Sequence, residues 1–286
     1  MKPAPFEYHR PTSLADVFDL LDRYGEDGRI LAGGQSLVPA LNMRLAAPRA
    51  IIDINRLPGL DEIRLAPQGL VIGALVRHET LERSALVAEH APLLAAAMPH
   101  VGHAAIRTRG TIGGSLALAD PAAELPACMV ALDAVIRVAG RERQRAVPAA
   151  EFFRGIYTTA LERGEVLTEV VVPPHAPGWR SAFDELARRH GDFALAGLAA
   201  RARVDGPVRD LRLVFFGVGP TPVRARTAEA AVTGRVPDSA ILAAAGRALE
   251  KDLDPPGDIH GSPALRRHLA RVLLGRVVTR LVEAGP

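Results

Sequence analysis

Cysteine is nearly absent from this chain of 286 residues, which contains only Cys128. A lone cysteine cannot form an internal disulfide, and an iron–sulfur cluster requires about four protein ligands, so the chain provides neither. Cys128 lies in the apolar run 127–132, where a small buried side chain is the ordinary role of a cysteine.

Lysine is equally scarce, with Lys2 and Lys251 as its only examples. No G-x-x-x-x-G-K-[ST] loop occurs, which argues against a lysine-clamped triphosphate, and no G-x-G-x-x-G fingerprint is present. The absence of H-E-x-x-H and of a Cys/His cluster argues against a metal site, and the absence of G-x-S-x-G leaves a serine nucleophile unsupported.

Aromatic residues make up only 4% of the chain, and its arginines are scattered at a net charge of +3. A nucleic-acid-binding surface would combine a basic stripe with aromatic side chains, so we interpret the arginines as ordinary surface charge. No apolar run reaches the roughly 18 residues of a membrane span, and the amino terminus has no apolar stretch of a secretory signal. We therefore expect a soluble, cytoplasmic protein.

Two glycine pairs dominate what the sequence does contain. The central segment runs from Arg107 to Pro126, and its core is Thr111-Ile112-Gly113-Gly114-Ser115. Adjacent glycines permit a turn with positive φ and remove each Cβ that would hold a ligand away, so that successive N–H groups can face an anion. The hydroxyls of Thr111 and Ser115 would add uncharged donors. The alternative is a tight turn between two buried strands.

An upstream segment repeats this arrangement, which favours an anion-binding loop over a tight turn between strands. Residues 29–39 read RILAGGQSLVP, an apolar strand followed by Gly33-Gly34, Gln35, Ser36 and a helix-forming run. Two glycine pairs, each followed by a serine, suggest two walls of one diphosphate site. A dinucleotide held mainly by backbone amides fits these residues best.

Apolar periodicity predicts an α+β protein. Expected helices cover 12–25, 37–45, 80–97 with a break at Pro92, a run from about Glu124, 225–232, 238–253 and 262–284, and expected strands cover 29–32, 50–55, 63–65, 70–72, 104–109, 134–138, 166–172, 179–188, 195–204 and 208–218. The prolines at 173–177 indicate a linker. Three long strands with tight turns after it favour an antiparallel sheet.

Two further side chains are candidates for a site. Glu124 opens a predicted helix, where its carboxylate either accepts hydrogen bonds from ribose hydroxyls or simply favours the helix dipole. Phe193 follows the turn Gly191-Asp192, and a core aromatic is the plain alternative. Arg107 and Arg109 alternate on the expected strand, so one of them faces the diphosphate or both lie on the surface.

These segments together resemble the FAD-binding medium subunits of molybdenum hydroxylases of the carbon monoxide dehydrogenase and xanthine dehydrogenase type. The resemblance spans the full length and rests on FEYHRPTSL from Phe6, AGGQSLVP from Ala32, RTRGTIGGSLALADPAAELPA from Arg107, GDFALAG from Gly191 and GVGPTPVRA from Gly217. It implies a two-subdomain FAD-binding fold of the vanillyl-alcohol oxidase (PCMH) type over 1–175, with subdomains of about 1–55 and 56–175. A C-terminal α+β domain with a three-stranded antiparallel sheet would cover 176–286.

The resemblance also implies which residues hold FAD. The diphosphate would lie between the two glycine segments, Glu124 near the adenosine ribose, Leu167 against the flavin or adenine, and Phe193 against the isoalloxazine. The implied FAD-binding residues are Leu31, Ala32, Gly33, Gly34, Gln35, Ser36, Leu37, Thr111, Ile112, Gly113, Gly114, Ser115, Glu124, Leu167 and Phe193. The chain departs from the family pattern at Gln35, where many relatives have His, and at Asp184-Glu185, where several have Lys.

The implied function is electron transfer in an oxidoreductase, with no catalytic residue and no metal ligand in this chain. A large partner would carry the molybdenum cofactor and a small partner [2Fe-2S] clusters, as a dimer of heterotrimers, with FAD passing electrons to an external acceptor. Two alternatives are a self-sufficient FAD-dependent oxidoreductase of the same fold and a flavin-binding assembly module without turnover. The sequence identifies neither the oxidised substrate nor the acceptor.

Overall fold

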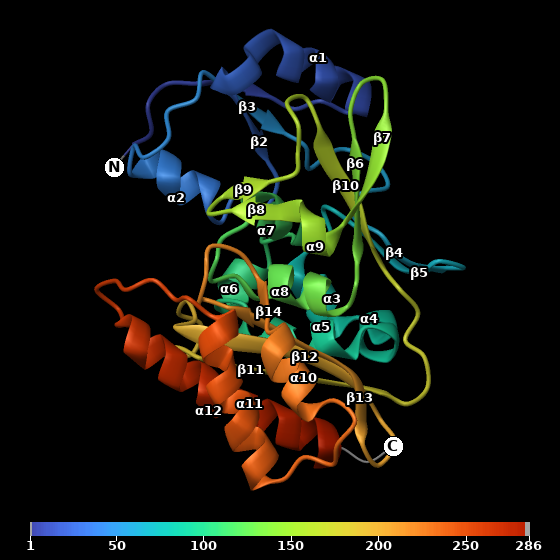
Figure 1. The fold of residues 1–286 in the computed structure, drawn as a ribbon. Coiled ribbons are helices and arrows are strands. Elements are labelled where there is room, and N and C mark those ends of the chain that lie inside the picture. The colour runs from blue at the N-terminus through green and yellow to red at the C-terminus, as the bar shows by residue number, and fades with distance from the viewer. Residues whose placement is uncertain (1, 284–286) are drawn as a thin grey trace.

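The structure is a computed structural model that describes residues 2–283, and its three units follow one another along the chain (Figure 1). The first unit is a parallel sheet of three short strands in the order β1-β3-β2. Its elements are β1 (Glu7–His9), α1 (Leu14–Tyr24), β2 (Gly28–Leu31), α2 (Leu37–Asn42) and β3 (Ala50–Asp53). All four residues of the central β3 are buried, as expected for a strand with neighbours on both sides.

Local sequence explains where α1 begins and ends. The Ser13 hydroxyl accepts a hydrogen bond of 3.2 Å from the N–H of Asp16, which satisfies one of the free donors of the first turn. Gly25 follows the helix at φ 54°, a conformation that glycine adopts without steric cost. The predicted helix 12–25 is thus confirmed, whereas strand β1 was not predicted.

The second unit is an antiparallel sheet in the order β4-β5-β10-β6-β7, with a two-stranded ribbon of β8 and β9 beside it. Its strands are β4 (Ile63–Ala66), β5 (Gly69–Gly73), β6 (Val135–Ala139), β7 (Gln144–Pro148), β8 (Phe153–Gly155), β9 (Thr158–Thr159) and β10 (Val166–Val172). Its helices are α3 (His78–Arg83), α4 (Ala85–His90), α5 (Pro92–Ala97), α6 (Ala104–Arg107), α7 (Ile112–Leu118), α8 (Glu124–Ala131) and α9 (Ala149–Phe152).

Two expectations for this unit are wrong in detail. The expected strand before the central glycine pair is the short helix α6, and the N–H of Arg107 bonds the carbonyl of His103 at 3.1 Å. The expected helix 80–97 breaks twice, at Pro92 and also at Ser84. The Ser84 hydroxyl caps α4 by accepting from the N–H of Val87, so a capping serine ends one helix and starts the next.

The third unit is an antiparallel sheet with helices on one face. It contains β11 (Trp179–Leu186), β12 (Ala196–Val204), β13 (Val208–Phe216) and β14 (Val223–Arg224), followed by α10 (Arg226–Val232), α11 (Ser239–Asp252) and α12 (Pro263–Glu283). The three predicted long strands are confirmed, and the two-residue β14 adds a fourth strand at the edge next to β13. The last residue of the predicted final helix, Ala284, lies outside the described residues.

Helix α8 connects the second unit to the third. All eight of its residues are buried, which explains why its sequence is apolar on every side. One face packs on α5 and the other on β12 and β13, while α10 and α12 cover the opposite face of that sheet and α11 packs on these two helices (Figure 1). The core around α8 therefore includes Phe183, Val214 and Phe216 from the third unit.

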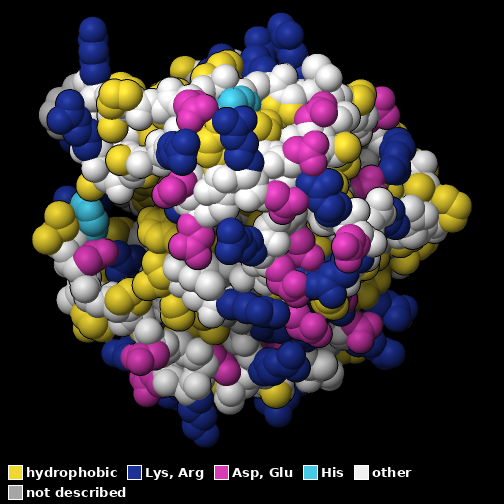
Figure 2. Space-filling model, turned by 90° about the horizontal axis from the view of Figure 1, so that it is seen from above, with side chains coloured by type: hydrophobic (Ala, Val, Ile, Leu, Met, Phe, Trp, Pro, Cys, Tyr) yellow, Lys and Arg dark blue, Asp and Glu magenta, His cyan; other side chains and the backbone are white. Residues whose placement is uncertain are grey.

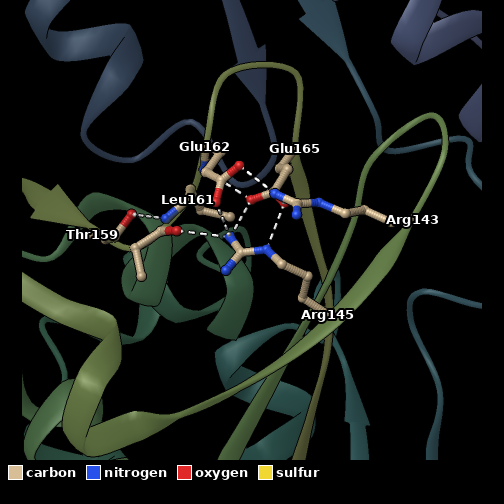
Figure 3. Close-up of polar contacts among 7 residues, drawn as sticks. Arg143, Arg145, Thr159, Leu161, Glu162 and Glu165 are labelled. Carbon is tan, nitrogen blue, oxygen red and sulfur yellow. Dashed lines mark hydrogen bonds and ion pairs between the residues drawn. The ribbon is translucent and has the colours of Figure 1, made fainter.

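An ionic cluster fixes the hairpin of β6 and β7 to the loop between β9 and β10 (Figure 3). Arg145 binds the nearly buried carboxylate of Glu165 through two nitrogens at 2.7 and 2.5 Å and also donates to the carbonyl of Ala160. The same carboxylate accepts from the N–H of Glu162, and Arg143 pairs with Glu162 at the rim. A bidentate arginine pair of this kind holds both geometry and charge.

The surface agrees with the interpretation of the arginines as scattered charge. On the face shown in Figure 2, Lys and Arg side chains alternate with Asp and Glu and form no continuous basic stripe. Several arginines pair locally, for example Arg141 with Asp19 and Asp22. Among residues 2–283, no helix is long and apolar enough to cross a bilayer.

Two separate glycines, Gly197 and Gly275, provide a stability test of the third unit. A Cβ on Gly197 would overlap the ring of the buried Phe216, so Gly197→Ala should destabilise the protein by about 1–3 kcal/mol. Gly275 lies within α12 and its Cβ would meet nothing within 4 Å, so Gly275→Ala should stabilise by about 0.5–1 kcal/mol. Thermal and urea unfolding of both variants measures the difference, and equal effects would contradict this packing.

Candidate functional site

The structure brings the two glycine segments into direct contact. A Cβ built on the buried Gly33 would lie 2.5 Å from the carbonyl oxygen of Arg109 and 2.8 Å from the Cα of Gly110. A Cβ on Gly114 would lie 3.8 Å from the Cβ of Ala32. The strand-to-helix loop of the first unit therefore packs on the loop before α7 in the second unit.

The first segment presents free backbone donors. Gly34 has φ 75°, and the chain turns there from β2 into α2. Within residues 2–283, no hydrogen bond uses the N–H of Gly33, Gly34, Gln35 or Ser36. Ser36 is exposed, but Gly33 is buried and Gly34 and Gln35 are half-buried. Amides in such positions are normally paired, so this row of unpaired N–H groups fits a ligand with acceptor oxygens.

The second segment differs from the expected turn. Gly113 and Gly114 lie in the first turn of α7 and have no positive φ, and Thr111 is the N-cap residue of that helix. The N–H groups of Ile112, Gly113 and Ser115 bond the carbonyls of Val76, Ala74 and Thr111, and the N–H of Gly114 bonds the Thr111 hydroxyl at 3.1 Å. The prediction that these amides face an anion is therefore wrong.

Close packing explains the second glycine pair instead. A Cβ on Gly113 would lie 2.6 Å from the Cβ of Ala74, and a Cβ on Gly114 would lie 2.8 Å from the Thr111 hydroxyl. Thr111 is buried, and its hydroxyl proton stays free to donate because the oxygen only accepts from Gly114. Ser115 is half-buried and its hydroxyl has no partner within residues 2–283, so this segment offers hydroxyls and not amides.

The remaining predicted site residues lie in different environments. Leu31 and Leu37 are half-exposed on either side of the first glycine pair, and Gln35 donates weakly to the Gly33 carbonyl at 3.4 Å. Ile112 and Leu167 are both buried in the core around α8. Leu167 also marks a shift of register between β10 and β6.

Phe193 is 74% exposed in the connection between β11 and β12, so the alternative of a core aromatic is wrong. This connection packs on the second unit, since a Cβ on Gly191 would lie 2.5 Å from the ring of His103. Arg107 does not face the glycine segments. Its guanidinium binds Glu82 at 2.8 and 3.2 Å and donates to the carbonyls of Val101 and Gly102.

Glu124 is buried at the start of α8 within a cluster of titratable groups. Burial raises the pKa of Glu124 to about 7, and the nearby carboxylate of Glu185 adds to this increase. Glu185 lies 3.6 Å from Nδ1 of His100, and that contact raises the pKa of the imidazole. The neighbouring Asp184 is paired with Arg280 at 2.9 Å. Both acids that stand where several relatives have lysine are therefore in contact with a basic side chain, Asp184 with Arg280 and Glu185 with His100.

Two residues that sequence reasoning did not identify lie between the glycine segments. Asn55 contacts Ala32, and Arg77 contacts Arg109. No motif marks either residue, because each acts through a contact between units that are distant in the sequence.

A parallel three-stranded unit, an antiparallel five-stranded unit and glycine-rich loops that meet between them are features of a protein that can hold an anionic nucleotide between two units. Comparison with known proteins agrees. The family described as "FAD binding domain in molybdopterin dehydrogenase" matches residues 4–175, and "CO dehydrogenase flavoprotein C-terminal domain" matches residues 181–281.

Individual relatives extend over the whole chain. The alpha subunit of the 6-hydroxypseudooxynicotine dehydrogenase complex of Paenarthrobacter nicotinovorans is 40% identical over 99% of this chain and 96% of its own length. The carbon monoxide dehydrogenase medium chain of Hydrogenophaga pseudoflava is 36% identical over 100% and 98%. A solved structure of the Hydrogenophaga pseudoflava carbon monoxide dehydrogenase superposes with a TM-score of 0.95 at 38% identity, covering 98% of both chains.

The chain belongs to the family of FAD-binding medium subunits of molybdenum hydroxylases. The resemblance stated from the sequence is thereby confirmed, and so are the fold class and the assignment as an FAD-binding electron-transfer subunit of an oxidoreductase.

The buried acid gives a pH-dependent prediction. Because burial raises the pKa of Glu124 from 4.5 to about 7, its carboxyl favours the folded state below pH 4.5, and this contribution is lost as the pH rises through 7. In the FAD-free protein, Glu124→Gln should change the melting temperature little at pH 4.5 and raise it at pH 8. The free energy of unfolding should increase at pH 8 by about 3 kcal/mol at most.

Thermal unfolding from pH 4.5 to 8 measures this effect. Glu151→Gln, at an exposed position on α9, is the control for the loss of one negative charge. A Glu124→Gln advantage that stays constant with pH would contradict a titration of this carboxyl in the folded state.

Proposed function

We propose that this FAD subunit receives electrons from an iron–sulfur partner subunit and passes them through FAD to an external acceptor. A large partner would hold the molybdenum cofactor and a small partner the [2Fe-2S] clusters, in a cytoplasmic dimer of heterotrimers. The single buried Cys128 supports this division, because the chain cannot ligate a cluster. Relatives named as a medium chain and as a subunit of a dehydrogenase complex support it as well.

The observation that carries the proposal is the meeting of free donors at the contact between two units. The unpaired N–H groups of Gly33, Gly34, Gln35 and Ser36 would bind the FAD diphosphate from one side. The hydroxyls of Thr111 and Ser115 would bind it from the other. Neutral donors suit this task, since they bind an anion without adding charge that would compete for other partners.

The other predicted FAD contacts are part of the same proposal. Leu31, Ala32, Leu37, Ile112, Gly113 and Gly114 would line the cofactor segments, Glu124 would bind near the adenosine ribose, Leu167 would pack on the flavin or adenine, and Phe193 would pack on the isoalloxazine. The exposure of Phe193 supports its role, because an apolar ring of this size on a surface is available for contact. We also propose domain limits of 1–175, with subdomains of about 1–55 and 56–175, and 176–286.

The bound FAD would supply the redox chemistry, as an acceptor of electron pairs that can also release electrons singly. The protein's own groups would bind the FAD, orient it and tune its redox potential. The substrate would be selected in the molybdenum subunit, which explains why relatives of one fold carry names as different as caffeine dehydrogenase and carbon monoxide dehydrogenase. A self-sufficient oxidoreductase would additionally require an acid or base positioned beside the flavin to act on a bound substrate.

Purification of the native complex tests the assignment. We expect this chain to copurify with two other subunits, and the complex to contain FAD, iron and molybdenum in fixed ratios. Flavin turnover by the isolated chain with an organic substrate would favour the self-sufficient enzyme, and a complex without flavin absorbance would contradict the proposal.

A point substitution tests the location of the diphosphate. A Cβ on Gly33 would lie 2.5 Å from the Arg109 carbonyl, so Gly33→Ala forces the two glycine segments apart and should lower FAD content at least about tenfold. Gly140→Ala is the control, because its Cβ would make only ordinary contacts at 3.5 Å or more. Full FAD occupancy in Gly33→Ala would show that the diphosphate lies elsewhere.

A further inference from the structure

A chain of polar contacts joins the two glycine segments through side chains that belong to neither. Nδ2 of Asn55 donates to the carbonyl of Ala32 at 2.8 Å. Ala32 directly precedes the first glycine pair. Oδ1 of Asn55 accepts from Arg77 at 2.6 Å. The other terminal nitrogen of Arg77 donates to the carbonyl of Arg109, two residues before Thr111. One amide and one guanidinium therefore span the contact between the first and second units.

The carbonyl of Arg109 is the point where this bridge meets the glycine packing. Gly33 approaches the same oxygen so closely that a Cβ would lie 2.5 Å away. The bridge and the glycine contact thus act on one peptide group from two directions. A shift of Arg109 would move both the wall that Gly33 rests on and the N-cap Thr111 beyond it.

The Asn55 end of the bridge is itself held by Asp53. Oδ1 of Asp53, at the end of β3, accepts from the backbone N–H of Asn55 at 3.0 Å and from its Nδ2 at 2.6 Å. The other oxygen of the buried Asp53 accepts from the Tyr8 hydroxyl, and Arg10 lies 3.5 Å away. Asn55 is therefore fixed in one orientation, in which its amide donates to Ala32 and its oxygen faces Arg77.

We propose that Asn55 and Arg77 are positioning residues for FAD, which set the separation of the two cofactor walls by bridging Ala32 to Arg109. The inference rests on the proposed placement of the diphosphate between these walls. Binding then needs no closure of the walls, because they are already held at the required separation, and a preorganised site binds more tightly than one that must be ordered.

Asn55 and Arg77 form one continuous bridge and not two independent contacts. Arg77 donates to the Asn55 oxygen with one terminal nitrogen and to the Arg109 carbonyl with the other, while Asn55 donates to Ala32, so the two side chains are links in series. Loss of either side chain opens the bridge, so loss of the second should add little. This non-additivity distinguishes a bridge from general stabilisation.

The test compares Arg77→Gln, Asn55→Ala and the double variant with the wild type. FAD affinity is measured by flavin fluorescence titration, in the isolated full chain or in its purified complex, whichever retains FAD in the wild type. We expect each single variant to bind FAD at least about tenfold more weakly, as for the loss of a charge-assisted hydrogen bond, and the double variant to be no more than about twofold weaker than the poorer single variant.

Arg64→Gln is the matched control. Arg64 also belongs to the second unit and pairs with one carboxylate, Glu169 at 2.7 Å, but it does not touch either glycine segment. The control should retain wild-type FAD affinity. The melting temperatures of the FAD-free proteins are measured in parallel. Arg77→Gln and Arg64→Gln should melt at similar temperatures, although only Arg77→Gln binds FAD more weakly.

Each outcome decides a separate question. Wild-type protein that retains FAD neither alone nor in its complex would overturn the proposed function, and the bridge with it. A wild type that binds FAD, together with variants of unchanged affinity, would overturn only the bridge. Additive losses in the double variant, or losses in proportion to a lower melting temperature of the FAD-free protein, would also overturn it in favour of a merely structural role.

Discussion

The close approach of Gly33 to the carbonyl of Arg109 is the contact on which the candidate site depends. It leaves no space for a Cβ, so only glycine lets the loop of the parallel unit rest on the loop before α7. The free amides of one segment and the hydroxyls of the other come together only through this contact. The Arg77 side chain donates a hydrogen bond to the same carbonyl, so packing and hydrogen bonding both fix the position of the Arg109 peptide group.

The two segments look alike in sequence but have different physical tasks. In the first, glycine permits a positive φ at Gly34, and four successive N–H groups have no hydrogen-bond partner within residues 2–283. In the second, glycine lets the first turn of α7 pack against Ala74, and its amides are consumed by the carbonyls of neighbouring segments. Under the proposed function, free amides on one wall and hydroxyls on the other would hold the diphosphate without lysine, and the chain has only two lysines.

Helix α8 has a comparable role for the third unit. It is buried between the second unit and the sheet of β12 and β13, and it carries Glu124 into a buried position. The carboxyl consequently lies near enough to Glu185 and His100, which come from two other elements, for their charges to influence its pKa. The unusual pKa of Glu124 is thus a result of tertiary packing, although the residue itself is placed by the start of a helix.

The sequence by itself determined the α+β class, the three long strands of the last sheet, the capped helix α1 and the positions of both glycine pairs. These features follow from periodicity, capping residues and turn residues, which act over a few neighbouring positions. Only the tertiary structure decided that residues 104–107 form a helix, that the amides of the second glycine pair are occupied, and that Asn55 and Arg77 connect the walls. The physical reason is distance along the chain: Ala74, Val76 and Ala32 take part in these contacts from segments that no local pattern relates to Arg109 or Gly113.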